Sequence, residues 1–138
     1  MEPLERFLDA QAPVIDAVRA ELARGRKSSH WMWFVFPQVS GLGHSAMAQR
    51  YAIASLAQAQ AYAAHPILGA RLRELTALVL AVEGRNAYEI FGTPDDLKFH
   101  SSMTLFAHVA PDEPLFRQAL AKYFAGSEDA ATVEILAL

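Results

Sequence analysis

The sequence predicts an all-α fold, and three observations carry this prediction. Apolar residues recur at helical spacing, capping residues together with Pro and Gly mark the ends of these stretches, and no two segments read clearly as paired strands. The chain has 138 residues, of which 53% are hydrophobic, which is enough for one buried core. We therefore expect residues 1–138 to form a compact multihelical single domain of about eight short to medium helices.

The first part of the chain is predicted to hold two helices before a basic loop. Residues 4–8 can form a short helical turn, and Pro13 suits the first turn of a longer helix. Apolar residues recur every four positions from Val14 to Leu22, and Gly25 can end this helix as its C-cap.

Residues 31–36 are the one ambiguous element of the prediction. They are aromatic, contain Val35 and lack polar alternation, so a buried strand would also suit them. Ser29 is placed as an N-cap, and no second segment reads as a partner strand. We therefore predict a helix.

Capping patterns mark the remaining helices. Ser55 with Gln58 forms a capping-box pattern, and Asn86 with Glu89 begins a short helix that Gly92 ends. We expect these helices over residues 55–64, from Pro66 to Gly84, from Asn86 to Gly92, from Thr93 and Pro94 towards His108, and after the caps Asp112 and Ser127.

Composition excludes several classes of function. The chain has no cysteine, which removes disulfides, thiol catalysis and zinc–thiolate sites. Its net charge of −3 argues against coating of nucleic acid, although a local basic patch is compatible with it. No apolar run approaches the roughly 18 residues that span a bilayer, and the N-terminus lacks a signal pattern. We expect a cytoplasmic protein without membrane contact, either a monomer or a homodimer.

Several sharper motifs are absent. Residues 25–28 lack the glycine spacing of a phosphate-binding loop, and Ser45 lacks the flanking glycines of a nucleophile elbow. The five histidines show no pair at metal-ligand spacing, and no dinucleotide fingerprint occurs. The sequence therefore predicts no metal and no cofactor.

Several separated phrases carry a resemblance to a known family. They lie at residues 25–33, 36–38, 41–45, 65–72, 91–98 and 101–106. From Phe7 and Gln11 to Thr132 the chain resembles a bacterial and fungal family catalogued as domain of unknown function 1810. The resemblance implies a small multihelical domain and no established activity. Some members carry the label calpastatin, but these residues give no reason to infer protease inhibition.

The helix after Pro94 holds the first candidate site. Lys98 lies one turn from Asp95 on one side and from Ser101 and Ser102 on the other, so one polar patch can form. In a structural interpretation the acidic residues cap the helix and pair with Lys98, while the serines bond backbone carbonyls. In a functional interpretation Lys98, Ser101 and Ser102 bind a phosphate or carboxylate, and Asp96 orients a sugar hydroxyl or a water.

The basic segment at residues 26–30 holds the second candidate site. Lys27 and His30 adjoin the aromatic element, and His30 could act in proton transfer or be bonded within the core. Trp31 or Tyr51 could stack on a base, with core packing as the alternative for each. If residues 31–36 are helical, Trp31 and Trp33 point to different sides, so only one of them reaches a ligand.

Two classes of function follow. The first is a pocket protein that binds, and could hydrolyse, a small phosphorylated ligand such as a nucleotide sugar or an ADP-ribose derivative, with His30 or Asp96 as the catalytic residue that transfers a proton. This hypothesis requires Lys27 and Lys98 to come together in one concave site. The alternative is a non-catalytic protein–protein interaction module that exposes apolar residues near Leu115, Phe116, Tyr123 and Phe124.

Overall fold

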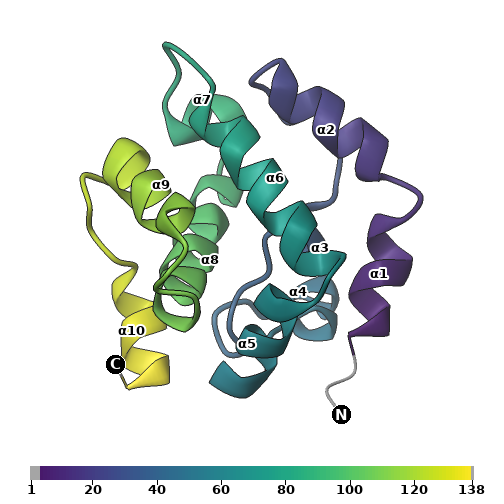
Figure 1. The fold of residues 1–138 in the computed structure, drawn as a ribbon, viewed down its shortest axis with the longest axis vertical. Coiled ribbons are helices and arrows are strands. Elements are labelled where there is room, and N and C mark those ends of the chain that lie inside the picture. Colours follow the sequence, from purple (N-terminus) through teal and green to yellow (C-terminus); the bar gives the residue numbers. More distant parts are fainter. Residues whose placement is uncertain (1–3, 138) are drawn as a thin grey trace.

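A computed structural model of the chain describes residues 4–137, which form ten α-helices (Figure 1). The helices are α1 (Glu5–Gln11), α2 (Ile15–Ala23), α3 (Met32–Val35), α4 (Ala46–Arg50), α5 (Leu56–Ala64), α6 (Leu68–Leu80), α7 (Ala87–Phe91), α8 (Asp95–Val109), α9 (Pro114–Phe124) and α10 (Ala130–Leu136). Within residues 4–137 the β-structure is limited to one isolated bridge, between Val39 and Ile53. The all-α prediction is confirmed.

Several predicted helix ends are confirmed. Gly25 follows α2 with a φ of 78°, in the left-handed region that favours glycine. The Ser55 hydroxyl accepts the Gln58 amide at the start of α5, at 3.1 Å. Helix α7 begins after Asn86 as predicted, and Asn86 and Glu89 form a capping box there.

Other boundaries differ from the prediction. The short helix α4 was not predicted, and the Ser45 hydroxyl caps it by accepting the Ala48 amide. Glu113 rather than Asp112 caps α9, and Asp129 rather than Ser127 caps α10. In each of these two cases the actual cap lies one or two residues further along the chain than the predicted one.

The aromatic element is helical, but it is shorter than predicted and is not capped by Ser29. Its helix α3 begins at Met32, and the N-cap position is Trp31, which provides no side-chain hydrogen bond. The Ser29 hydroxyl and amide both donate to the carboxylate of Glu21. Ser29 therefore links the loop after α2 back to that helix.

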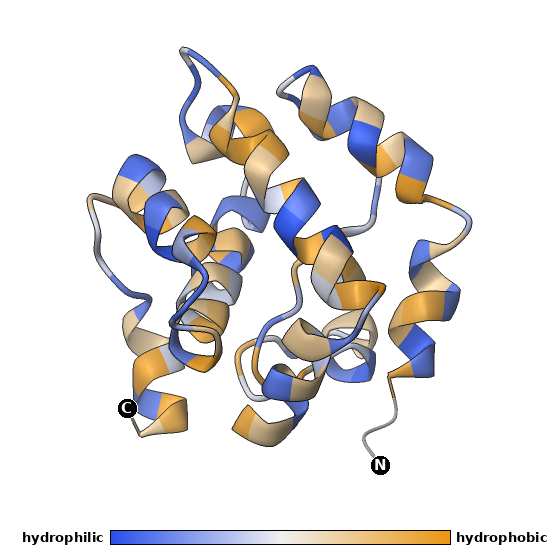
Figure 2. Ribbon diagram, viewed as in Figure 1, coloured by the Kyte–Doolittle hydropathy of each residue, from blue (hydrophilic) through white to orange (hydrophobic). Residues whose placement is uncertain are grey.

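Helix α8 lies at the centre of the fold. Residues 101–107 are all buried, and α8 packs against α5, α7, α9 and α10. The long helix α6 packs against α2, α5 and α9 (Figure 1). Most helices carry both hydrophilic and hydrophobic residues (Figure 2). No helix among residues 4–137 is long and apolar enough to cross a membrane.

Candidate functional site

Two lysines from distant parts of the chain meet at one carboxylate. The ammonium group of Lys27 lies 2.9 Å from Asp95 Oδ2, and that of Lys98 lies 3.4 Å from Asp95 Oδ1. Lys27 comes from the loop after α2, whereas Asp95 and Lys98 are one turn apart at the start of α8. The polar clusters of the two candidate segments are therefore adjacent in space.

The carboxylate of Glu21 organises the loop that carries Lys27. Glu21 is only 4% exposed and accepts hydrogen bonds from the Ser28 amide, the Ser29 amide and hydroxyl, and the Trp31 indole. Burial by itself would raise the pKa of Glu21, but these donors outweigh it and lower the pKa to about 2. Glu21 is therefore ionised at neutral pH, and it fixes the loop through its hydrogen bonds.

A groove beside α8, which we call the α8 groove, has a volume of about 360 Å³. One part of its wall is polar and another part is apolar. Its lining residues are Gln38, Leu42, Gly43, Pro94, Leu97, Lys98, Ser101, Asp129 and Ala131. The groove therefore presents a cation, a carboxylate, an amide and a hydroxyl beside an apolar surface, which is a combination that small-ligand sites use.

A hydrogen-bond network runs through the polar wall of the α8 groove. Gln38 Nε2 donates to Ser101 Oγ at 3.1 Å, and Ser101 Oγ lies 3.2 Å from the Leu97 carbonyl and 3.3 Å from Asp129 Oδ2. The Asp129 amide donates to Thr104 Oγ1, which anchors the start of α10 on α8. The network holds the polar side chains of the groove in place.

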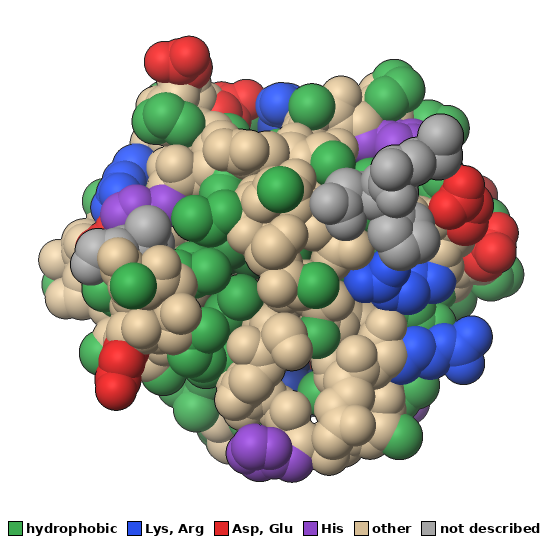
Figure 3. Space-filling view, turned by 90° about the horizontal axis from the view of Figure 1, so that it is seen from below, with side chains coloured by type: hydrophobic (Ala, Val, Ile, Leu, Met, Phe, Trp, Pro, Cys, Tyr) green, Lys and Arg blue, Asp and Glu red, His purple; other side chains and the backbone are tan. Residues whose placement is uncertain are grey.

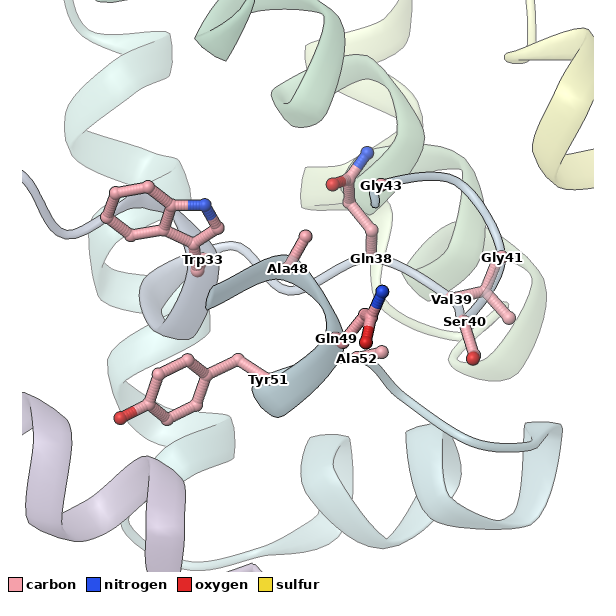
Figure 4. Close-up of a pocket in the computed structure, with 10 residues that line it drawn as sticks. All are labelled: Trp33, Gln38, Val39, Ser40, Gly41, Gly43, Ala48, Gln49, Tyr51 and Ala52. Atoms are coloured by element: carbon pink, nitrogen blue, oxygen red, sulfur yellow. The ribbon is translucent and has the colours of Figure 1, made fainter. Parts of the chain in front are cut away.

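A neighbouring groove between α3 and α4 shares Gln38 and Gly43 with the α8 groove (Figure 4). Its volume is about 310 Å³, and Trp33 and Tyr51 also line it. Lys98 lies over the Trp33 ring, 4.9 Å from the centroid, so Trp33 is the tryptophan beside the candidate site. The Tyr51 hydroxyl points away from Gln38 in Figure 4, and Tyr51 is 7% exposed.

The other predicted site residues lie outside these two grooves. Trp31 is fully buried, so it is unavailable for stacking on a base, and Ser102 is buried with no partner for its hydroxyl among residues 4–137. His30 is exposed, and Asp96 accepts the amide of the next residue, Leu97, at 2.9 Å. Of the predicted ligand-binding residues, only Lys98 and Ser101 line the α8 groove.

A third groove runs along α7 and has a volume of about 440 Å³. Lys27 lines it together with the exposed side chains of Arg26, Arg85 and Tyr88. The ammonium group of Lys27 is directed to Asp95 and to the Ser29 carbonyl, which it reaches at 2.6 Å. Lys27 and Lys98 therefore meet at Asp95 but line different grooves, so the predicted single concave site that holds both lysines is not present among residues 4–137.

The residues on which the interaction-module alternative depended are not strongly exposed. Phe116 is buried, and Leu115, Tyr123 and Phe124 are half-buried. Hydrophobic side chains do gather beside α10 on the lower face of the molecule (Figure 3). Among residues 4–137 no group of three His, Asp or Glu side chains is arranged to hold a metal ion.

The sequence interpretation missed three polar residues that matter to the site. Glu21 falls on the apolar face that Val14, Val18 and Leu22 define, and an acidic residue on such a face is a detectable signal. Asp129 was missed because the sequence analysis assigned the N-cap of this helix to Ser127. Gln38 has no sequence signal, because its role depends on contact with α8, 63 residues away.

The fold and the grooves define a small all-α protein with ligand-sized polar grooves. Residues 1–136 match the family described as "Protein of unknown function (DUF1810)", and the chain belongs to this family. The chain is similar to the conserved hypothetical protein Rv1873 from Mycobacterium tuberculosis, with 56% identity, a TM-score of 0.97, and coverage of 99% of this chain and 98% of that chain. No curated protein matches the chain.

Proposed function

We propose that this protein binds a small phosphorylated ligand, such as a nucleotide sugar or an ADP-ribose derivative, in the α8 groove. The observation that carries the proposal is the convergence of Lys27 and Lys98 on Asp95. Two ammonium groups against one carboxylate leave one positive charge without a counter-charge in this cluster. An anionic group of a ligand can supply it through charge-assisted hydrogen bonds.

The two lysines have different roles in this proposal. The Lys27 side chain is 8% exposed and donates to both Asp95 and the Ser29 carbonyl, so it orients Asp95. The Lys98 side chain is 20% exposed, has the longer contact with Asp95 and lines the α8 groove. Lys98 is therefore the group that binds the phosphate.

The rest of the lining supports a ligand with both polar and apolar parts. Leu42, Pro94 and Leu97 offer an apolar surface for a ring, and Leu97 is 59% exposed. Neither His30 nor Asp96, the two residues predicted to transfer a proton, lines the groove. The carboxylate that does line it, Asp129, is held as the N-cap of α10 and accepts from Ser101 and Thr132. We therefore propose binding alone, with ADP-ribose left intact after incubation.

Thermal unfolding with ADP-ribose tests the proposal. A ligand at 100 times its Kd stabilises a protein by about 2.7 kcal/mol, which raises the Tm by several degrees. We expect Lys98→Ala to lose most of this increase. The variant should still fold, because Asp95 keeps its closer partner Lys27.

Arg24→Ala is the matched control for Lys98→Ala. It also removes one positive charge, from an exposed side chain that lines none of the three grooves. We expect this variant to keep the full increase in Tm with ADP-ribose. The proposal is contradicted if wild type shows no increase with ADP-ribose or nucleotide sugars, or if both variants respond as wild type does.

A further inference from the structure

We infer that Asp129 and Gln38 select a ligand by its sugar hydroxyl groups. This inference rests on the proposed function, because it assumes that Lys98, which lines the same groove one turn from Ser101, binds a phosphate. It concerns the remaining part of the ligand and assigns a specificity-determining role to Asp129. No sequence motif points to this role.

The two carboxylate oxygens of Asp129 are used unequally. Oδ2 accepts from Thr132 Oγ1 at 2.7 Å, from the Thr132 amide at 3.0 Å and from Ser101 Oγ at 3.3 Å. Oδ1 has no hydrogen-bond partner among residues 4–137, and the half-buried Asp129 lines the α8 groove. A carboxylate oxygen in this setting needs a donor from water or from a ligand.

Gln38 provides a second acceptor beside the first. Its Nε2 is fixed by donation to Ser101 Oγ, and its Oε1 has no partner among the residues that the structure describes. Ser101 contacts both side chains, so it keeps Gln38 and Asp129 next to each other. The groove thus offers two acceptors that are held by one serine.

This pair of acceptors is suited to hydroxyl groups and unsuited to phosphate. An ionised phosphate is an acceptor with a negative charge, which the Asp129 carboxylate repels. A sugar hydroxyl has a proton to donate to Asp129 Oδ1 or Gln38 Oε1. A sugar phosphate therefore fits in one orientation, with its phosphate at Lys98 and its hydroxyl groups at Asp129.

The capping role of Asp129 does not account for Oδ1. The contacts with Thr132 at the start of α10 all involve Oδ2, and an N-cap needs only one acceptor oxygen. Asparagine caps helices about as well as aspartate does. Asp129→Asn should therefore retain α10 while removing the charge and one of the acceptors.

Calorimetric titration with ribose 5-phosphate, 2-deoxyribose 5-phosphate and inorganic phosphate tests the inference. The two sugar phosphates differ by one hydroxyl group. We expect wild type to prefer ribose 5-phosphate by about tenfold, the effect of one hydrogen bond to a charged acceptor. Asp129→Asn should reduce this preference to about twofold or less, and should bind inorganic phosphate as well as wild type or better.

Glu128→Gln is the matched control, because it makes the same carboxylate-to-amide change in the preceding residue. Glu128 does not line the α8 groove and binds Arg117 at 3.0 Å and His108. We expect this variant to keep the wild-type preference. If Asp129→Asn does not fold, Gln38→Ala should lower the preference by about threefold or more, again as expected for a lost hydrogen bond.

Three results would overturn the inference while the proposed function stands. They are equal affinity of wild type for the two sugar phosphates, an unchanged preference in both Asp129→Asn and Gln38→Ala, and an equal loss of preference in Glu128→Gln. The last result would mean that movement of this segment causes the effect. Failure of wild type to bind any of the three probes would overturn the proposed function and the inference together.

Discussion

Replacing Glu21 with glutamine should destabilise the protein in a pH-dependent way. Glu21 is 4% exposed. Its carboxylate accepts hydrogen bonds from two backbone amides, one hydroxyl and one indole, and the three N–H donors lie 2.7–3.0 Å from it. Glutamine has the same shape but no charge, and its amide nitrogen cannot accept the Ser29 hydroxyl. The substitution therefore mimics a permanently protonated Glu21.

The magnitude follows from the pKa of Glu21. It falls from an ordinary value of 4.5 to about 2 in the folded protein. Each tenfold change in proton affinity is worth about 1.4 kcal/mol, so ionised Glu21 contributes about 3 kcal/mol to folding at pH 7. Because the folded pKa lies below the unfolded value, this contribution is complete above 4.5 and is lost as the pH falls towards 2.

Urea unfolding followed by circular dichroism at pH 7 and pH 3 measures the effect. We expect Glu21→Gln to lose about 3 kcal/mol of unfolding free energy at pH 7 and only about 1 kcal/mol at pH 3. Glu74→Gln is the control, since Glu74 is an exposed partner of Arg19 and should cost less than about 1 kcal/mol. A Glu21→Gln loss as small as the control's, or one of equal size at both pH values, would show that the ionised Glu21 carboxylate does not stabilise the fold in this way.

Two further predictions concern packing and charge, and urea unfolding at pH 7 measures both. A Cβ on Gly69 would lie 2.1 Å from the Ala63 carbonyl oxygen. Gly69→Ala should therefore lower the free energy of unfolding by about 3 kcal/mol. A loss below about 1 kcal/mol would contradict this clash. Lys27→Met should lower the free energy of unfolding by about 2 kcal/mol. Removing one partner of a buried ion pair typically costs roughly 3 to 5 kcal/mol, but here Asp95 still has Lys98 as a partner. Lys98→Met should cost less than Lys27→Met, and the reverse order would show that Lys98 is the main partner of Asp95.

Helix ends were predictable from the sequence where local chemistry decides them. The glycine after α2 and the capping box of α7 depend only on residues within a few positions of each other. The start of α10 was not predictable, because Ser127 and Asp129 are both suitable caps. The choice between them is made by Thr104 of α8, which accepts the Asp129 amide.

The candidate site was also predictable only where neighbouring residues on one helix determine a contact. The spacing of Asp95 and Lys98 on one helix turn predicts their contact. The contact of Lys27 with Asp95 was not predictable from the sequence, because it depends on how the loop after α2 packs against α8. Trp33 rather than Trp31 borders the site because the indole of Trp31 donates to the buried carboxylate of Glu21.

The contacts of Glu21 explain why a lysine can be nearly buried at position 27. Lys27 lies in a loop whose next residues are fixed by the Glu21 carboxylate, so its backbone has little freedom to carry the ammonium group to solvent. The Ser29 carbonyl, part of the same fixed loop, accepts from Lys27 on one side, and Asp95 binds it on the other. Asp95 is in turn held in place and can share only its second oxygen with Lys98. The position of Lys98 at the α8 groove therefore depends, through Lys27 and Asp95, on the carboxylate of Glu21, which does not line the groove.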